Sequence, residues 1–308
     1  MKKIIITGAT GFIGVHLIKN WLEQDVEIYA VIRPHSKNAA RIPRNSKVHV
    51  IELSMKEINK LSNIIDSADC FYHLAWEGAR APFRDDVNMQ KNNYECALQA
   101  YETAKKMGCS FFLGSGSQAE YGLTNGLVDE NYPCNPTTEY GKQKLNASRE
   151  LLKRANNDGI KLIWTRIFSI YGPYDYPGTL IMTCIEKMKS NEPVELTQCT
   201  QLWDYLYVED AARAMMLFAE KECESGVYII ASGEYRPLRE YVEEIKRILG
   251  SSSILSFGAV PYGAQGPVNL TPNPEKTKKV LNWEVKHPFS ENIDKMTKEA
   301  NFLNIPVR

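Results

Sequence analysis

Short apolar segments alternate with longer amphipathic segments through the first half of the chain. The apolar segments are rich in β-branched and aromatic side chains, as buried strands are. They predict strands at residues 4–7, 27–32, 48–53, 70–74, 110–113 and 162–167. The intervening segments have apolar residues at helical spacing and predict helices at about residues 12–24, 56–66, 88–107 and 139–157. This alternation predicts an α/β fold with a doubly wound parallel sheet, a Rossmann fold.

The pattern becomes less regular after Tyr171-Gly172-Pro173, where prolines and glycines separate shorter elements. Strand and helix signals return near residues 205–232. We therefore expect a nucleotide-binding Rossmann domain over residues 1–172 and a smaller lobe formed mainly by residues 173–308. Ligands of such sheets bind outside the carboxyl ends of the strands, so this C-terminal lobe would bind the substrate.

A glycine motif follows the first predicted strand. Three isoleucines lead into Thr7, and glycines stand at positions 8, 11 and 14. Gly8 allows the positive φ of a tight strand-to-helix turn, and Gly11 has no Cβ to obstruct a pyrophosphate. Gly14 lets the helix pack closely against the strand, and the helix N-terminus directs N–H groups at phosphate. The motif predicts a dinucleotide cofactor at this edge of the sheet.

Composition and charge exclude several classes of function. The 308 residues include 37 Lys or Arg and 37 Asp or Glu, so net charge favours neither nucleic acid nor an anionic membrane as a partner. No apolar segment approaches the roughly 20 residues that span a bilayer. The seven cysteines show no metal-binding spacing, so we expect no metal. The N-terminal segment is predicted to be a core strand, not a cleaved signal peptide, and we expect a cytoplasmic protein.

A second motif, Tyr140-Gly-Lys-Gln-Lys144, falls in the helix predicted at about residues 139–157. Residues four apart lie on one helix face, so the phenol and the ammonium group point the same way. A neighbouring cation lowers the pKa of a phenol from its free value of about 10, so we expect Tyr140 to exchange a proton near neutral pH. Ser117 follows the strand predicted at residues 110–113, near the expected cofactor.

These motifs resemble the extended short-chain dehydrogenase/reductase family. The glycine spacing, a hydroxyl residue four positions before Tyr121-Gly122 and the later Tyr-x-x-x-Lys match its pattern. The resemblance implies that Tyr140 is the acid/base, Lys144 its electrostatic partner and ribose ligand, and Ser117 a hydrogen-bond donor to the reacting oxygen. Further matches indicate the nucleotide-sugar branch: His73-Leu74-Ala75, Asn93, Arg166 through Tyr171-Gly172-Pro173, and residues 204–210.

The motifs and the resemblance together define two sets of expected ligand contacts. The cofactor set comprises Gly8, Thr10, Gly11, Phe12, Ile13, Gly14, Arg33, Ser36, Lys37, Leu53, Leu74, Ala75, Asn93, Tyr140, Lys144 and Ile167. The substrate set comprises Trp76, Ser117, Gln118, Ser169, Trp203 and Arg236.

Departures from the family pattern narrow the expected reaction. Nucleotide-sugar 4,6-dehydratases resemble this chain but have Asp-Glu after the catalytic hydroxyl residue, where this chain has Gln118-Ala119. The 3,5-epimerase-reductases have a cysteine at the position of Ala119. These differences leave a 4-ketoreductase, or alternatively a 4-epimerase with tightly bound NAD. Residues 249–262 resemble a segment of CDP-abequose-type synthases, which reduce CDP-4-keto-3,6-dideoxyhexoses.

The end of the second predicted strand bears on the choice of cofactor. NAD enzymes usually have an acidic residue there for the ribose 2′-OH, whereas this chain has Arg33, followed by Ser36 and Lys37. Arg33 offers a planar donor fork to a 2′-phosphate, and the alternative is that it stacks on adenine. We expect NADP(H) to be preferred, with NAD(H) as the alternative. An NADPH preference favours a net reductase over an epimerase.

Trp203 stands where the family usually has the arginine that binds the substrate diphosphate. Lys187, Arg236 or Arg239 would then replace that charge, or the indole would stack on a base or sugar.

The family also implies a homodimer through a four-helix bundle formed by the helices at about residues 88–107 and 139–157. Candidate contacts are Tyr94, Leu98, Tyr101, Leu145 and Leu152, for which an intramolecular core is the alternative. A non-catalytic cofactor-binding regulator on the same scaffold is a further alternative, which retention of Ser117, Tyr140 and Lys144 argues against.

Overall fold

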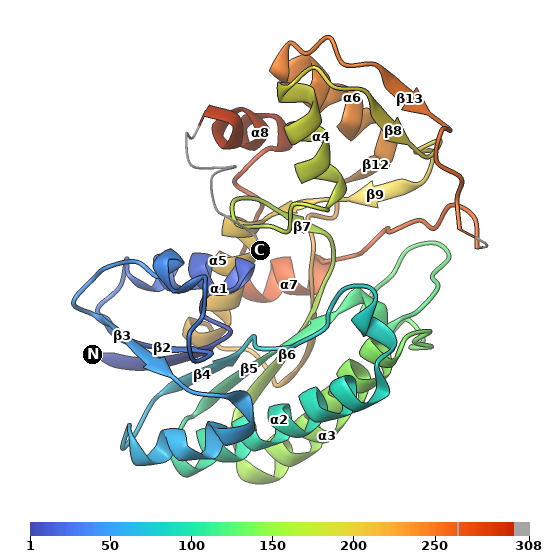
Figure 1. Cartoon of the computed structure of the whole chain (residues 1–308). Coiled ribbons are helices and arrows are strands. Elements are labelled where there is room, and N and C mark those ends of the chain that lie inside the picture. Colours follow the sequence, from blue (N-terminus) through green and yellow to red (C-terminus); the bar gives the residue numbers. More distant parts are fainter. Residues whose placement is uncertain (264, 299–308) are drawn as a thin grey trace.

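The computed structural model describes residues 1–263 and 265–298, and its larger part is built on a seven-stranded sheet (Figure 1). All neighbouring strands in this sheet pair in parallel. Their order is β11-β6-β5-β4-β1-β2-β3, so the winding direction reverses between β1 and β4. The strands are β1 (Lys2–Thr7), β2 (Val26–Ile32), β3 (Val48–Glu52), β4 (Cys70–His73), β5 (Phe111–Ser117), β6 (Lys161–Ile167) and β11 (Gly226–Ile230). The predicted doubly wound sheet is confirmed.

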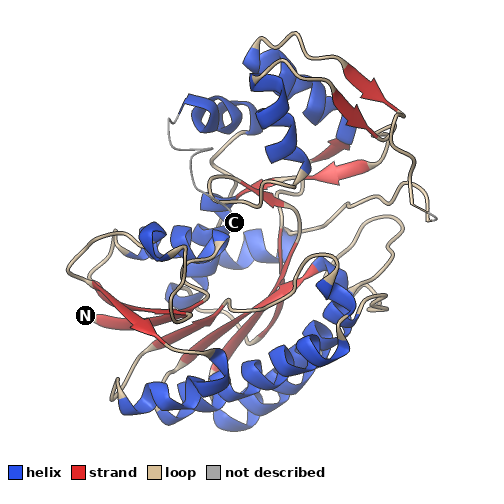
Figure 2. Cartoon of the chain, in the orientation of Figure 1, coloured by secondary structure: helices blue, strands red, loops and turns tan. Residues whose placement is uncertain are grey.

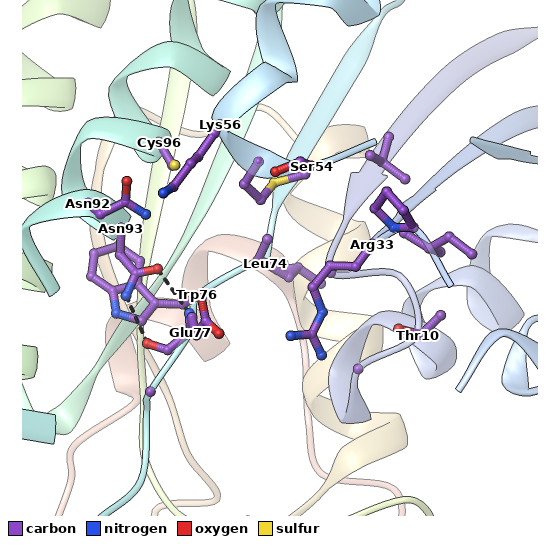
Figure 3. A pocket seen from close by; sticks show the side chains of 18 of the residues that line it. Thr10, Arg33, Ser54, Lys56, Leu74, Trp76, Glu77, Asn92, Asn93 and Cys96 are labelled. Atoms are coloured by element: carbon purple, nitrogen blue, oxygen red, sulfur yellow. Dashed lines mark hydrogen bonds between the residues drawn. The ribbon is translucent and has the colours of Figure 1, made fainter. Parts of the chain in front are cut away.

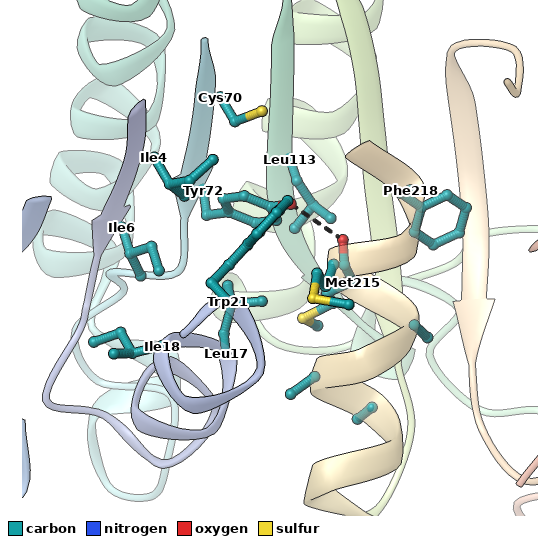
Figure 4. Close-up of a cluster of buried hydrophobic side chains, with 14 of the residues drawn as sticks. Ile4, Ile6, Leu17, Ile18, Trp21, Cys70, Tyr72, Leu113, Met215 and Phe218 are labelled. Atoms are coloured by element: carbon teal, nitrogen blue, oxygen red, sulfur yellow. Dashed lines mark hydrogen bonds between the residues drawn. The ribbon is translucent and has the colours of Figure 1, made fainter. Parts of the chain in front are cut away.

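Helices cover both faces of the sheet (Figure 2). One face packs against α1 (Phe12–Trp21), α5 (Val208–Glu220) and α7 (Glu275–Leu281). Figure 4 shows part of this core, where the Tyr72 hydroxyl donates to the Met215 carbonyl at 3.4 Å. The other face packs against α2 (Val87–Lys106), α3 (Glu139–Asp158) and the 3₁₀ helix η2 (Met55–Asn63). Ile4, Ile5 and Ile6 of β1 are fully buried, because a central parallel strand is covered on both faces.

The segment predicted as a helix at about residues 56–66 forms the 3₁₀ helix η2 instead of an α-helix. The Ser62 hydroxyl donates to the Asn59 carbonyl at 3.0 Å, a local bond that competes with regular helical pairing. The sequence placed the element correctly but not its geometry.

A smaller lobe stands over the carboxyl ends of the strands (Figure 1). Its hydrophobic core includes Ile185, Val242 and Ile293, each from a different helix. The lobe contains α4 (Leu180–Lys189), α6 (Leu238–Leu249), α8 (Phe289–Lys298), β8 (Val194–Leu196), β9 (Leu202–Asp204), β12 (Tyr235–Pro237) and β13 (Leu255–Phe257). Two short strands, β7 (Ile170–Tyr171) and β10 (Leu206–Tyr207), pair in parallel between the lobe and the sheet.

Two residues expected at a dimer interface belong to the interior of this chain. Tyr101 is fully buried, and its hydroxyl donates to Asp158 at 3.0 Å. Leu145 is also buried. Tyr94, Leu98 and Leu152 are only partly buried along α2 and α3, so these three of the five candidate contacts keep area available to a second chain.

Candidate active site

Two adjoining clefts lie at the carboxyl edge of the sheet. The first has a volume of about 600 Å³ and follows the ends of β1, β2 and β4, around the point where the winding reverses. The second has a volume of about 520 Å³ and lies between β5, α3 and the smaller lobe. Leu74 and Trp76 line both clefts and form the wall that they share.

The turn after β1 is closely packed at the floor of the first cleft. Gly8 has φ +68°, and a Cβ there would come within 2.8 Å of the Ala75 backbone nitrogen. A Cβ on Gly14 would collide with the Gly8 carbonyl, so this position permits only glycine. No side chain caps the N-terminus of α1, and its first turn contains no acidic residue. These features fit the pyrophosphate of a dinucleotide, which would lie against the N–H groups of α1.

Cations and amides surround the rest of the first cleft (Figure 3). Thr10 and Arg33 approach from one side, and Lys56 and Asn93 from the other. The Asn93 side chain is held in place, since its amide nitrogen donates to the Glu77 carbonyl at 2.8 Å and its amide oxygen accepts from the Glu77 N–H at 3.0 Å. Figure 3 marks both bonds.

Some expected cofactor contacts lie outside the first cleft. Ser36 lies just behind its lining, with its hydroxyl 3.4 Å from that of Thr10, whereas the exposed Lys37 and the buried Leu53 do not line it. Phe12, Ile13 and Ile167 line the second cleft instead. Sequence reasoning missed Asn38, Ser54 and Lys56, although residues 54–56 come two residues after the end of β3, where a ligand contact is expected in this fold.

Ser117, Tyr140 and Lys144 come together in the second cleft. Ser117 ends β5, and its hydroxyl accepts from the Ala119 N–H at 3.2 Å. Tyr140 and Lys144 lie in the first turns of α3, which begins there because the Thr138 hydroxyl caps it by accepting from the Gly141 N–H at 3.1 Å. The structure therefore brings the three expected catalytic side chains together from a strand end and a helix start.

Burial controls the charge of the two ionisable groups. Burial raises the pKa of Tyr140, while a hydrogen bond with Ser117 and the nearby Arg84 act in the opposite direction. Burial also lowers the pKa of Lys144 to about 7. The Lys144 ammonium donates to the Ser115 carbonyl at 2.5 Å and lies 3.7 Å from the centre of the Trp76 ring. The prediction that Lys144 lowers the pKa of Tyr140 is wrong in this structure, because burial disfavours both charged forms and the opposing groups are Ser117 and Arg84.

A buried ion pair supports the position of Ser117. The Glu120 carboxylate accepts from the Ser117 N–H, the Trp164 indole and the Arg166 guanidinium, each at 2.9 Å. Glu120 is fully buried and Arg166 is 5% exposed. Sequence reasoning noted Arg166 but missed Glu120, whose only signal is its place directly before Tyr121-Gly122.

The expected substrate contacts are divided between two places. Trp76, Ser117, Gln118, Ser169 and Trp203 line the second cleft. Arg236 does not: it pairs with Glu244 in a separate cleft of the smaller lobe, and its guanidinium lies 4.0 Å from the centre of the Tyr241 ring. Lys187 and Arg239 also lie outside the lining of the second cleft.

Within residues 1–263 and 265–298, no group of three or more His, Cys, Asp or Glu side chains could hold a metal ion. The helices described there include none that is long and apolar enough to cross a bilayer.

Comparisons with known proteins agree with this geometry. The family model for the NAD dependent epimerase/dehydratase family matches residues 4–231. A CDP-abequose synthase of Salmonella muenchen is 24% identical, and the match covers 96% of this chain and 97% of that protein. A dTDP-6-deoxy-L-talose 4-dehydrogenase (NAD(+)) of Aggregatibacter actinomycetemcomitans is 28% identical, with 78% of this chain and 88% of that protein covered.

Solved structures show the same fold. The UDP-glucuronic acid 4-epimerase of Bacillus cereus in complex with NAD has a TM-score of 0.83 and 23% identity, covering 95% of this chain and 96% of that one. The UDP-glucose 4-epimerase of Thermotoga maritima with UDP-glucose has a TM-score of 0.84 and 23% identity over the same shares.

Proposed function

Since the chain belongs to the NAD dependent epimerase/dehydratase family, whose members similar to it act on nucleotide sugars, we propose that it is an NAD(P)H-dependent 4-ketoreductase of a nucleotide-activated sugar. The observation that carries the proposal is the meeting of Ser117, Tyr140 and Lys144 beside the wall shared with the first cleft. A deoxysugar is the proposed substrate, because the abequose synthase is similar over 96% of this chain and the dTDP-6-deoxy-L-talose 4-dehydrogenase over 78%.

Each of the three residues has a distinct part in this reaction. The cofactor, held by the glycine turn of the first cleft, would supply the hydride when bound. Tyr140 gives its proton to the sugar oxygen as that oxygen gains charge, and its raised pKa keeps the phenol protonated before transfer. Ser117 donates a hydrogen bond to the same oxygen. Lys144 would hold the cofactor ribose from the side facing Trp76.

Dehydration is not supported by the acids of the second cleft. Gln118 and Ala119 follow Ser117, and neither side chain can carry a proton to or from a sugar carbon. Among the described residues that line this cleft, Asp175 is the one carboxylic acid. Its oxygens are occupied by Arg80 at 3.3 Å and the Thr179 hydroxyl at 3.0 Å. Transfer of a hydride to one sugar carbon and of a proton to the oxygen on that carbon is the chemistry that fits the remaining groups.

The proposed cofactor is NADP(H), with NAD(H) as the alternative. Arg33 lines the first cleft at the end of β2 and offers its guanidinium to a 2′-phosphate, whereas Lys56 lies on the opposite side of the cleft (Figure 3). One of the solved relatives named above is in complex with NAD. If the exposed Arg33 stacks on adenine instead of binding a 2′-phosphate, NAD(H) would be the cofactor of this chain as well.

A nucleotide-sugar 4-epimerase with retained NAD is the second candidate. It is favoured by the same triad, which serves either direction of hydride transfer, and by the epimerases among the solved relatives. The cofactor that copurifies separates the two functions. We expect NADP(H) that is released on dilution, and NADPH consumption when 4-keto nucleotide sugars are supplied. Retained NAD, together with interconversion of two nucleotide sugars and no net NADPH consumption, would establish the epimerase instead.

We also propose a cytoplasmic homodimer formed along α2 and α3. The partly buried Tyr94, Leu98 and Leu152 on these helices support it. Light scattering should give the mass of two chains, and Leu98→Glu should shift it toward one. A single-chain mass for the wild type at micromolar concentration would rule out this dimer.

A further inference from the structure

Two arginines of the loop between β4 and α2 reach into the second cleft. Arg80 and Arg84 line it together with Ser117 and Tyr140. The loop that carries them is fixed, because the Gln90 side chain donates to the Gly78 carbonyl at 2.9 Å and to the Phe83 carbonyl at 3.0 Å. The Asp85 carboxylate also accepts from the Glu139 N–H at 3.1 Å, which ties the loop to the first turn of α3.

Arg80 already forms an ion pair within the protein. Its guanidinium lies 3.3 Å from the Asp175 carboxylate, which is buried, and 4.7 Å from the centre of the Tyr176 ring. Arg80 therefore closes one side of the cleft and neutralises its acid. The ammonium of Lys144 is likewise engaged, since it lies beneath Trp76 and donates to the Ser115 carbonyl.

Arg84 has no such partner. Its guanidinium carbon lies 5.1 Å from the centre of the Tyr140 ring, at the reacting end of the cleft. Its Nε is buried without a hydrogen-bond acceptor, and no carboxylate forms an ion pair with it in the part of the chain that the structure describes. An arginine stays protonated in a protein, so this cation, which lines the cleft and has no carboxylate partner among the described residues, is available to an oxyanion.

We infer that Arg84 binds an oxyanion of the substrate: either an oxygen of the nucleotide diphosphate or a carboxylate on the sugar. The inference rests on the proposed function for the presence of a nucleotide sugar in this cleft. Arg84 would supply the positive charge for the substrate that the sequence led us to expect from Lys187, Arg236 or Arg239, because none of those three residues lines the second cleft. The site would select for substrates that place a negative group within reach of the guanidinium beside Tyr140.

Direct binding tests the inference without requiring turnover. Isothermal titration of the NADPH-saturated protein would use UDP, CDP, dTDP, UDP-glucose, UDP-glucuronate and inorganic pyrophosphate as probes. Arg84→Gln should weaken the bound probes by about 10- to 100-fold, as expected for a lost charge-assisted bond, and Arg84→Lys should recover part of the affinity. Arg239→Gln is the matched control, because that arginine lies on the smaller lobe outside the cleft and should leave affinity unchanged.

The probes distinguish the two sources of the oxyanion. Equal losses for the nucleoside diphosphates and both sugars assign the diphosphate, and a loss confined to UDP-glucuronate assigns a carboxylate. Wild-type affinity of Arg84→Gln for every probe would overturn the inference, provided that its melting temperature and NADPH affinity match the wild type. Binding that depends on Arg84, together with no NADPH consumption when 4-keto nucleotide sugars are supplied, would leave the site standing and contradict the proposed reductase. If no probe binds the wild type, the inference about Arg84 fails, whereas NADPH consumption with 4-keto nucleotide sugars tests the proposed reductase separately.

Discussion

The two clefts that share Trp76 as part of their wall differ in the groups that line them. The first is formed by backbone and by side chains at strand ends, and glycines at its floor let the chain turn where a Cβ would collide. The second contains the ionisable groups Tyr140, Lys144, Arg84 and Asp175, most of them buried. A backbone cradle can hold a ligand largely independently of pH, whereas the chemistry of buried charges depends on neighbours that the fold supplies. Substitutions should therefore affect cofactor binding in the first cleft, and substrate binding, proton transfer or folding in the second.

The largest expected effect is at the second cleft. Tyr140→Phe should lower kcat by about 10²- to 10⁴-fold while NADPH affinity is largely kept, because only the exchanging proton is lost. Single-turnover oxidation of NADPH and a separate fluorescence titration measure the two quantities. Tyr235→Phe, at an exposed tyrosine of the smaller lobe, serves as the control. A Phe variant that turns over at the wild-type rate would remove Tyr140 from the mechanism.

The buried ion pair beneath Ser117 should have a large effect on folding. Glu120→Gln leaves the Arg166 guanidinium buried without its carboxylate, which should reduce the free energy of unfolding by about 3–5 kcal/mol. Urea unfolding measures this loss. Glu102→Gln removes an exposed pair with Arg154 and should change stability by less than about 1 kcal/mol. Equal losses in the two variants would show that the buried pair has no special role.

A smaller effect is expected in the first cleft. Arg33→Ala should remove most of the preference for NADPH over NADH, about one to two decades in the ratio of dissociation constants, because a charge-assisted bond to the 2′-phosphate is lost. NADH affinity should change little. Lys37→Ala is the control, since Lys37 does not line this cleft. A wild type that binds NADH at least as tightly as NADPH would place Arg33 on adenine and favour the epimerase.

The smallest effect is a pH dependence of stability. Lys144 has a pKa of about 7 in the folded protein, lowered by burial from its ordinary value of 10.5. Between these values the unfolded chain binds the proton that the folded chain lacks, so stability should rise with pH, by up to about 1.4 kcal/mol per pH unit. Below pH 7 both states are protonated and the contribution is constant. Denaturation from pH 6 to 9 should show stability rising more steeply with pH above pH 7 in the wild type than in Lys144→Met; parallel curves would contradict this prediction.

Local chemistry determined much of this protein. Apolar segments placed the strands, because a strand buried on both faces must be apolar along its whole length. The glycines at 8, 11 and 14 specified the turn, since only residues without a Cβ fit there. The four-residue spacing of Tyr140 and Lys144 put both on one side of α3 through helix geometry alone.

Tertiary structure decided the charges and partners of the second cleft. The pKa of Lys144 follows from its burial beneath Trp76, 68 residues earlier in the chain, and no local pattern records that distance. Glu120 meets Arg166 only because β5 and β6 are neighbours in the sheet. Arg236 forms an ion pair with Glu244 outside the second cleft, whereas the Arg84 guanidinium lies over the Tyr140 ring inside it. Burial and long-range contact depend on how distant segments pack, and that information exists only in the folded chain.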